Sequence, residues 1–331
     1  MRFCGILVVL MALLLAGCGG ESARPPVTPP PVTQPEPPAK PLKLRSEAIP
    51  TTAVKITPSM DVYPPVLHSS EFQPPVSVGA GVNTAGAEDS AFVTWDGADL
   101  YFFFTPDPAV PAEKQLLDGV TGIYHSRKVG EQWQPAERVL LETDTSQALD
   151  GCVLVQGGQM WFCSARQGNY RSIDMWTAEL KDGQWTDWQN AGALLNRDYK
   201  IGEMHLTATG DEIYFHSDEA SKGGLDIWVT RKVGGAWQLP ENVLAVNTLG
   251  DEGWPFLTPD GNELWFTRWY QGAPALYRSQ KVGGQWSQPE LIISHFAGEP
   301  SLDEDGNLYF THHFFRDGKM LEADIYIARR R

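Results

Sequence analysis

The fold is decided by residues 251–289, which read DEGWPFLTPDGNELWFTRWYQGAPALYRSQKVGGQWSQP. Two short apolar runs flank Asp260-Gly261, a dipeptide typical of a hairpin turn. A third run begins at Ala275 after a Gly/Pro loop, and a fourth begins at Trp286 and is stopped by Pro289. The stretch therefore predicts four short strands connected by turns.

The same four-stranded unit recurs along the chain. The second strand of each unit has an aliphatic residue followed by two aromatic ones, and these strands begin at Leu100, Met160, Ile213, Leu264 and Leu308. Their aromatic residues are 44 to 60 residues apart. Four-stranded units at this period are typical of a β-propeller, so we expect an all-β chain. The simplest role for the aromatic side chains is packing between blades, and a sugar-stacking platform is the alternative for any one of them.

The fifth unit is short of one strand, because the chain ends at Arg331 soon after its third strand. Residues 71–76 have the aromatic-then-proline pattern of the missing fourth strand, and residues 82–88 match residues 246–252, which lead into the fourth unit. We therefore expect residues 66–331 to form a five-bladed β-propeller of four-stranded blades. An N-terminal strand would close its ring and leave no open edge.

Residues 251–266 and 217–228 resemble the WD40-like (PD40) propeller repeat of TolB-type periplasmic proteins. The resemblance covers roughly residues 66–331 and implies a propeller fold in a periplasmic protein. TolB-type proteins have an additional N-terminal domain and six blades, and neither is evident in this sequence. Because such propellers serve many roles, the resemblance predicts a fold rather than a function.

The N-terminus predicts export. Met1-Arg2 precede an apolar run that ends at Ala16 and is too short to span a membrane. The ending Leu-Ala-Gly-Cys resembles a bacterial lipobox, which implies that residues 1–17 are a lipoprotein signal peptide and that Cys18 carries lipid such as palmitate. The alternative is an ordinary signal peptide with a chance cysteine. Gly19 follows Cys18 where Asp would favour the inner membrane, so the resemblance implies an outer-membrane lipoprotein of the cell envelope with a periplasmic propeller.

Residues 18–65 are expected to form a lipid-anchored linker. Nine prolines lie between Pro25 and Pro41, so we expect the segment to be extended and unable to pack. The net charge of −15 argues against binding nucleic acid or anionic lipid by charge alone, so membrane contact is expected through the lipid only.

Two cysteines remain in the propeller region, Cys152 and Cys163, on either side of Gly157-Gly158. If the two glycines are the central turn residues, the cysteines lie opposite each other near disulfide distance. If the turn slides by one residue, the pair is offset. We expect a disulfide, with two small buried thiols as the alternative.

Acidic residues begin the first strand of each unit. Alignment on the second-strand aromatics places Glu88 and Glu252 at one position, and it places Asp150, Glu203 and Glu299 two residues later alongside Trp254. If these strands line the axis, five carboxylates approach one mouth of the ring. Three further residues are expected near the same mouth: Asp89, His205 and Arg268.

Three roles remain open for these acids. They can accept hydrogen bonds from neighbouring blades, or bind a cation such as Ca²⁺, although no ordered ligand spacing is present and no cofactor is expected. They can also act as paired catalytic carboxylates of a glycoside hydrolase, with Glu88 or Asp89, Asp150 and Glu203 as candidates. His312-His313 is a weak metal signal, and no other metal site is predicted.

These features favour a non-catalytic binding or scaffold module for an envelope protein or glycan. The alternative is a glycoside hydrolase-like enzyme that uses the carboxylates at the mouth of the axis.

Overall fold

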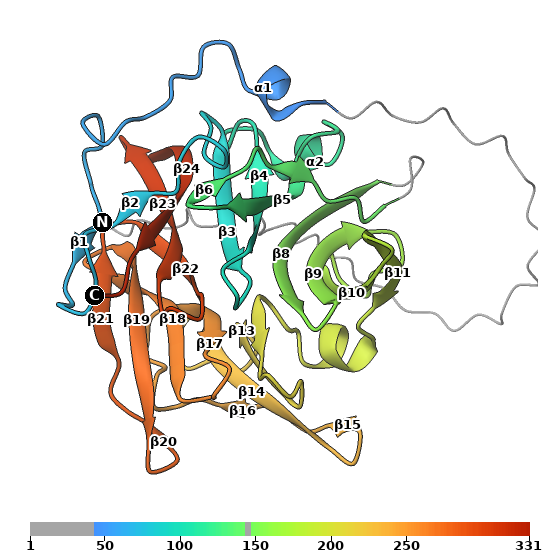
Figure 1. Ribbon diagram of the computed structural model, residues 1–331. Coiled ribbons are helices and arrows are strands. Elements are labelled where there is room, and N and C mark those ends of the chain that lie inside the picture. The colour runs from blue at the N-terminus through green and yellow to red at the C-terminus, as the bar shows by residue number, and fades with distance from the viewer. Residues whose placement is uncertain (1–42, 143–146) are drawn as a thin grey trace, which may run out of the picture.

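The computed structural model describes residues 43–142 and 147–331, and it is all-β with several sheets (Figure 1). Helical structure in this part of the chain is limited to three short elements: α1 (Arg45–Ala48), α2 (Ala112–Gln115) and the π-helical turn η1 (Leu194–Asp198). None of the described helices is both long enough and apolar enough to cross a membrane. The signal peptide, Cys18 and the proline-rich part of the linker lie outside the described residues.

The strands of the described residues fall into five groups along the chain. Group 1 contains β3 (Ala87–Val93), β4 (Asp99–Thr105), β5 (Gly122–Val129), β6 (Gln132–Trp133) and β7 (Glu137–Arg138). Group 2 contains β8 (Ala148–Gln156), β9 (Gln159–Arg166), β10 (Asp174–Lys181) and β11 (Gln184–Asn190). Group 3 contains β12 (Met204–Leu206), β13 (Glu212–Ser217), β14 (Asp226–Val233), β15 (Ala236–Trp237) and β16 (Glu241–Asn242).

Groups 4 and 5 each include a strand from the N-terminal side of the chain. Group 4 contains β17 (Glu252–Leu257), β18 (Glu263–Tyr270), β19 (Ala273–Val282), β20 (Gln285–Trp286), β21 (Glu290–Ser294) and β1 (Val66–Leu67). Group 5 contains β22 (Ala297–Leu302), β23 (Leu308–Arg316), β24 (Lys319–Ala328) and β2 (Val76–Ser77). Strand β2 pairs antiparallel with β24, and Phe72 bridges to Arg330 beside it. A single parallel bridge between Ala323 and Ala87 joins group 5 to group 1.

Each described hydrophobic core cluster lies between two neighbouring groups. The aromatic pairs of the second strands explain this arrangement, because successive side chains of a strand point to opposite faces. Tyr101 belongs to the cluster shared with group 2, whereas Phe102 belongs to the cluster shared with group 5. Trp265 and Phe266 likewise divide between groups 5 and 3. One short sequence motif therefore attaches each group to both of its neighbours.

Asparagine side chains lock three of these junctions. Asn83 accepts a hydrogen bond from the backbone N–H of Ile325 and donates to the carbonyl of the same residue. Asn196 does the same to Met175, and Asn247 does the same to Ile227. The match between residues 82–88 and 246–252 therefore has a physical basis, because both segments carry an asparagine that replaces two backbone partners of a neighbouring strand.

Cys152 and Cys163 form a disulfide, with their Cα atoms 5.2 Å apart. Gly157 and Gly158 are the central turn residues and both have positive φ, as a tight hairpin turn requires. The register nevertheless shifts between Gly151 and Leu154, so the residue directly opposite Cys163 is Gly151. Cys152 is the extra residue of a β-bulge, and the bulge brings its side chain to bonding distance.

The N-terminal segment 43–63 packs against the β domain, contrary to the expectation that residues 18–65 form an extended linker that does not pack. Arg45 inserts beside β3, Lys55 reaches β24, and the Nε2 of His312 lies 2.8 Å from Asp61. Figure 1 shows the segment passing over β24, β3 and β4. The proline-rich run ends at Pro41, and Arg45, Lys55 and Asp61, which make these contacts, lie after it.

Candidate functional site

The first strands of groups 1, 2, 4 and 5 share a β-bulge that sets the geometry of the site. Ser90, Cys152, Trp254 and Glu299 occupy it, with φ between 51° and 58°, a range in which non-glycine residues are uncommon. The pairing register shifts at this point in each of the four strands β3, β8, β17 and β22. A bulge turns side chains away from their regular direction, so these residues and their neighbours are presented differently from those of a flat strand.

The position of the bulge shows that the sequence alignment misplaced Asp150. Asp150 lies two residues before the bulged residue, as Glu88 and Glu252 do, and therefore shares their position rather than that of Glu299. Four residues separate the paired Val155 and Met160, whereas six separate the equivalent pair Leu257 and Leu264, so the connection after β8 is two residues shorter. Counting back from the second-strand aromatics misplaced Asp150 by this difference.

The three acids at this position are each neutralised by an arginine. The Nε of Arg268 donates to Glu252 at 2.9 Å, and the Nη2 of Arg166 donates to Asp150 at 2.6 Å. Both guanidinium groups also donate to a backbone carbonyl, those of Val246 and Leu141 respectively. Each guanidinium lies over two aromatic rings, which adds a cation–π attraction in a partly desolvated site. Acids held in this way contribute to the fold and are not free for chemistry.

In group 1 the arginine comes from the N-terminal segment. Phe104 occupies the register position of Arg268, so the strand itself cannot supply a guanidinium there. Arg45 supplies it instead: its Nη1 donates to Glu88 at 3.0 Å and to the carbonyl of Val82 at 2.7 Å. Burial, opposed by the Arg45 charge, raises the pKa of Glu88 to about 7.

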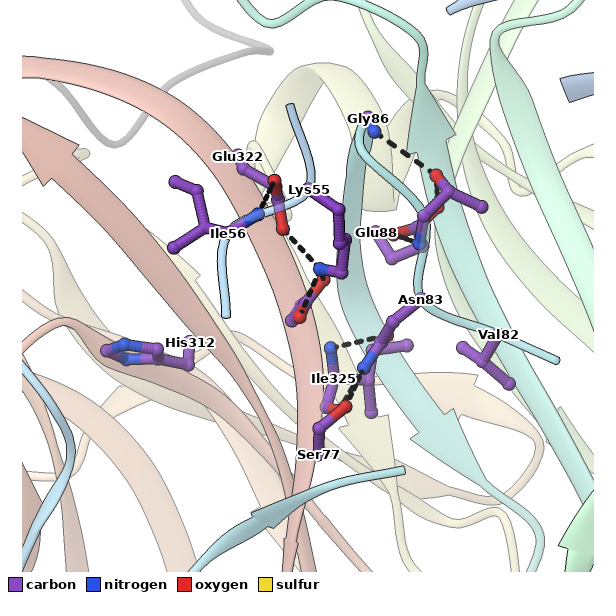
Figure 2. Close-up of polar contacts among 12 residues, drawn as sticks. Lys55, Ile56, Ser77, Val82, Asn83, Gly86, Glu88, His312, Glu322 and Ile325 are labelled. Carbon is purple, nitrogen blue, oxygen red and sulfur yellow. Dashed lines mark hydrogen bonds and ion pairs between the residues drawn. The ribbon is translucent and has the colours of Figure 1, made fainter. Parts of the chain in front are cut away.

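Group 5 lacks the asparagine that groups 2 and 3 place beside an acid of the third strand, and Lys55 of the N-terminal segment takes its place (Figure 2). Asn190 and Asn242 donate to the carboxylates of Asp174 and Asp226 at the start of the third strand. The equivalent acid in group 5 is Asp324, but Ser77 stands at the asparagine position and the Nζ of Lys55 donates to Asp324 at 2.6 Å.

Lys55 also contacts Glu322, whose other oxygen accepts from the backbone N–H of Ile56 at 3.0 Å. Burial, opposed by the Lys55 charge, raises the pKa of Asp324 to about 8. The N-terminal segment therefore supplies Arg45 as the partner of Glu88 in group 1 and Lys55 as the partner of Asp324 in group 5.

The acids that do converge are Asp89, Glu203 and Glu299, from groups 1, 3 and 5. Asp89 and Glu299 have carboxylate oxygens within 4.8 Å of each other, and the backbone N–H of Ser90 donates to Asp89 at 3.1 Å and to Glu299 at 2.7 Å. Glu203 interacts electrostatically with both. His313 completes this axial cluster, with its Nε2 3.1 Å from Asp89.

Charge is unevenly distributed in the axial cluster. Burial works to raise the pKa of Asp89, but the neighbouring His313 outweighs it and the pKa is lowered. Burial and the charge of Asp89 raise the pKa values of both Glu203 and Glu299. Carboxylates with pKa values pushed in opposite directions can exchange protons with a ligand.

The remaining candidates surround this cluster. The indole Nε1 of Trp254 donates to Glu203 at 3.0 Å, and the backbone N–H of Trp254 donates to His216. His205 is buried against Phe256, and burial lowers its pKa to about 3, so it is a neutral core residue. Arg268 belongs to the Glu252 pair described above.

Sequence reasoning did not single out His216, Ser90, Arg45 or Lys55. Arg45 and Lys55 lie in the segment that the sequence assigned to the linker. His216 of group 3 contacts Trp254 of group 4, and the sequence does not show that these two groups meet. His313 gave a weak signal because its partner Asp89 lies 224 residues away in the sequence.

Two open pockets lie elsewhere on the described surface. One, of about 630 Å³, is lined by Trp95 and by residues at the turns of β17–β19. The other, of about 540 Å³, adjoins Arg268 and Asn247. Neither is lined by the residues of the axial cluster.

No family model and no curated protein matches the chain. Among solved structures it is similar to TolB from Acinetobacter baumannii, at 13% identity and a TM-score of 0.43, over 75% of this chain and 56% of that one. A glycoside hydrolase is similar at 11% identity and a TM-score of 0.48, over 77% of this chain and 62% of that one. A xylan beta-1,4-xylosidase from Bacillus halodurans C-125 is similar at 13% identity and a TM-score of 0.45, over 75% of this chain and 53% of that one. The chain thus spans less than two thirds of each of these three.

Proposed function

We propose that this chain is an envelope lipoprotein whose β domain is a five-bladed propeller that binds a protein or glycan partner without catalysis. The five strand groups are the blades. Each described core cluster is shared by two neighbouring groups, including groups 5 and 1, and this supports a closed ring. The pairing of β2 with β24 supports closure by the N-terminal strand.

One observation favours binding over catalysis: the acids at the mouth are occupied by contacts within the protein. Glu88, Asp150 and Glu252 are each paired with an arginine. Asp89 and Glu299 have carboxylate oxygens within 4.8 Å of each other and both accept from the backbone N–H of Ser90, whereas a glycoside hydrolase holds its two carboxyl groups about 5 Å or more apart, with the sugar between them. The partner would therefore contact the rim of the mouth rather than enter it.

Tyr170 and Trp95 offer a matched test of this surface. Tyr170 is 51% exposed in the loop after β9, at the mouth end, and Trp95 is 42% exposed in a turn at the opposite end of group 1. A partner captured from envelope extract and then purified should bind Tyr170→Ala at least about tenfold more weakly than wild type, and Trp95→Ala equally well. Equal binding by both variants would place the interface elsewhere.

The alternative, a glycoside hydrolase-like enzyme, is favoured by the opposite pKa shifts of Asp89 and Glu203. Incubation with a panel of soluble glycans distinguishes the two functions. The binding proposal predicts no release of reducing ends. Turnover that is lost in Asp89→Asn and Glu203→Gln but kept in Asp150→Asn would establish the enzyme instead.

The proposed anchoring rests on Cys18 and is tested separately. Cells fed a palmitate analogue should label the wild-type protein in the outer-membrane fraction, and Cys18→Ala should remove both the label and the membrane association. A Cys18→Ala protein that remains in the membrane fraction would show that lipid is not the anchor.

A further inference from the structure

Asp89, Glu299 and His313 bring three possible metal-ligand atoms together at the axis. One atom from each residue lies within 4.8 Å of the other two. The His313 side chain is fully buried and that of Asp89 is 15% exposed. The residues come from β3, β22 and β23, so no local sequence motif announces the set.

The orientation of His313 separates this cluster from a simple group of acids. Its Nδ1 lies 3.4 Å from the carbonyl oxygen of Phe296, which can only accept a hydrogen bond, and its Nε2 lies 3.1 Å from a carboxylate oxygen of Asp89. When only Nδ1 carries a hydrogen, the Nε2 lone pair faces that oxygen, and a proton or a metal ion between the two atoms removes their repulsion. Metal-binding histidines typically have one ring N–H on a backbone carbonyl and the other nitrogen on the ion.

The carboxylates of Asp89 and Glu299 also require a positive charge between them. Asp89 and Glu299 both accept from the backbone N–H of Ser90, and two ionised carboxylates this close repel unless a proton or a cation lies between them. Glu203 adds a third acid nearby, whereas the arginines of the mouth are bound to Glu88, Asp150 and Glu252.

We propose that Asp89, Glu299 and His313 bind a divalent transition-metal ion such as Zn²⁺ or Mn²⁺. Ligand atoms about 2.1 Å from such an ion are about 3.0 Å apart in octahedral coordination and about 3.4 Å apart in tetrahedral coordination, and the 3.1 Å between His313 and Asp89 lies in this range. Imidazole favours these ions over Ca²⁺, which binds oxygen ligands. The site goes beyond partner binding and does not depend on it, and the ion would link blades 1 and 5 at the axis.

Metal content tests the site directly. The purified mature protein is stripped with a chelator and dialysed against equal concentrations of Zn²⁺, Mn²⁺ and Ca²⁺, and bound metal is measured by mass spectrometry. We expect about one transition-metal ion per chain, with at least about a hundredfold weaker binding in Glu299→Gln and His313→Gln. Co²⁺ should give a visible absorption band in wild type that is absent from His313→Gln.

Asp150→Asn is the matched control, because Asp150 is a buried acid of the same mouth outside the cluster. Zn²⁺ or Mn²⁺ should raise the Tm of wild type and Asp150→Asn, but not that of Glu299→Gln. If His313→Gln does not fold, Asp89→Asn takes its place. Binding of Ca²⁺ alone, no bound metal in wild type, or equal stoichiometry in all variants would overturn the proposal.

Discussion

Arg45 of the N-terminal segment makes the contact to Glu88 that Arg268 makes to Glu252 in group 4. Glu88 has the same partners as Glu252, including a threonine four residues earlier, but its arginine comes from the N-terminal segment. Phe104 explains the exchange, because it fills the position from which Arg268 reaches its acid.

Removing Arg45 should destabilise the domain in a pH-dependent way. Arg45→Ala leaves Glu88 buried without a cation, which costs about 3 kcal/mol when the carboxylate is charged. The folded-state pKa of Glu88, about 7 with Arg45 present, then rises further above its unfolded value, so the folded protein binds an extra proton and is relatively more stable at low pH. The loss measured by urea denaturation should therefore be small at pH 5 and large at pH 8.

Two variants control this prediction. Arg45→Ala with Glu88→Gln should recover most of the loss at pH 8, because no buried charge remains. Arg127→Ala removes an exposed arginine paired with Asp99 and should change stability by less than about 1 kcal/mol. An equal loss in Arg45→Ala at both pH values would mean that packing, rather than charge, is what Arg45 contributes.

At the scale of elements, the N-terminal segment 43–63 is part of the β domain. It contributes Arg45, Lys55 and Asp61 to contacts with β3, β24 and β23. Ser77 is too short to replace the asparagine of the other groups, and Lys55 takes over its role.

A chain that begins at residue 64 should therefore be less stable than one that begins at residue 43. Glu88, Glu322 and Asp324 would lose their cations, and a Tm lower by about 10 °C is expected from differential scanning calorimetry. The chain that begins at residue 43 should match the mature protein, because it keeps all of these contacts. Equal Tm values for the two truncated chains would show that the segment adds nothing to stability.

The sequence predicted the strands well because their signals are local. The aromatic pairs at Tyr101 and Trp265 and the turn at Asp260-Gly261 each act within a few residues. The acids were harder to place, because their positions depend on bulges and turn lengths. Asp150 was misaligned by the short turn at Gly157-Gly158, and the contact of Asp89 with His313 spans 224 residues.

At the scale of the whole molecule, the N-terminal side of the chain meets the C-terminal strands. Phe72 is fully buried in the cluster shared by groups 4 and 5, and β1 and β2 pair with β21 and β24. These pairings cover edges of β21 and β24 that would otherwise be open to aggregation.

Deleting residues 66–80 should strongly destabilise the domain. Loss of the buried Phe72 ring alone costs about 3–5 kcal/mol, and strands β21 and β24 would lose backbone partners. Circular dichroism and urea denaturation should show partial unfolding or aggregation, with Phe72→Ala intermediate. A deleted chain with wild-type stability would refute closure of the ring by this segment.

Closure is tested most directly by trapping the strand pair itself. Val76 pairs with Ile327, so Val76→Cys with Ile327→Cys should form a disulfide on oxidation, detected as a linked peptide by mass spectrometry. Val76→Cys with Ile293→Cys should not, because Ile293 pairs with Leu67 of β1 instead. A link in the first variant and none in the second is the predicted result; no link in the first, in a folded protein, would contradict a ring closed by its N-terminal strand.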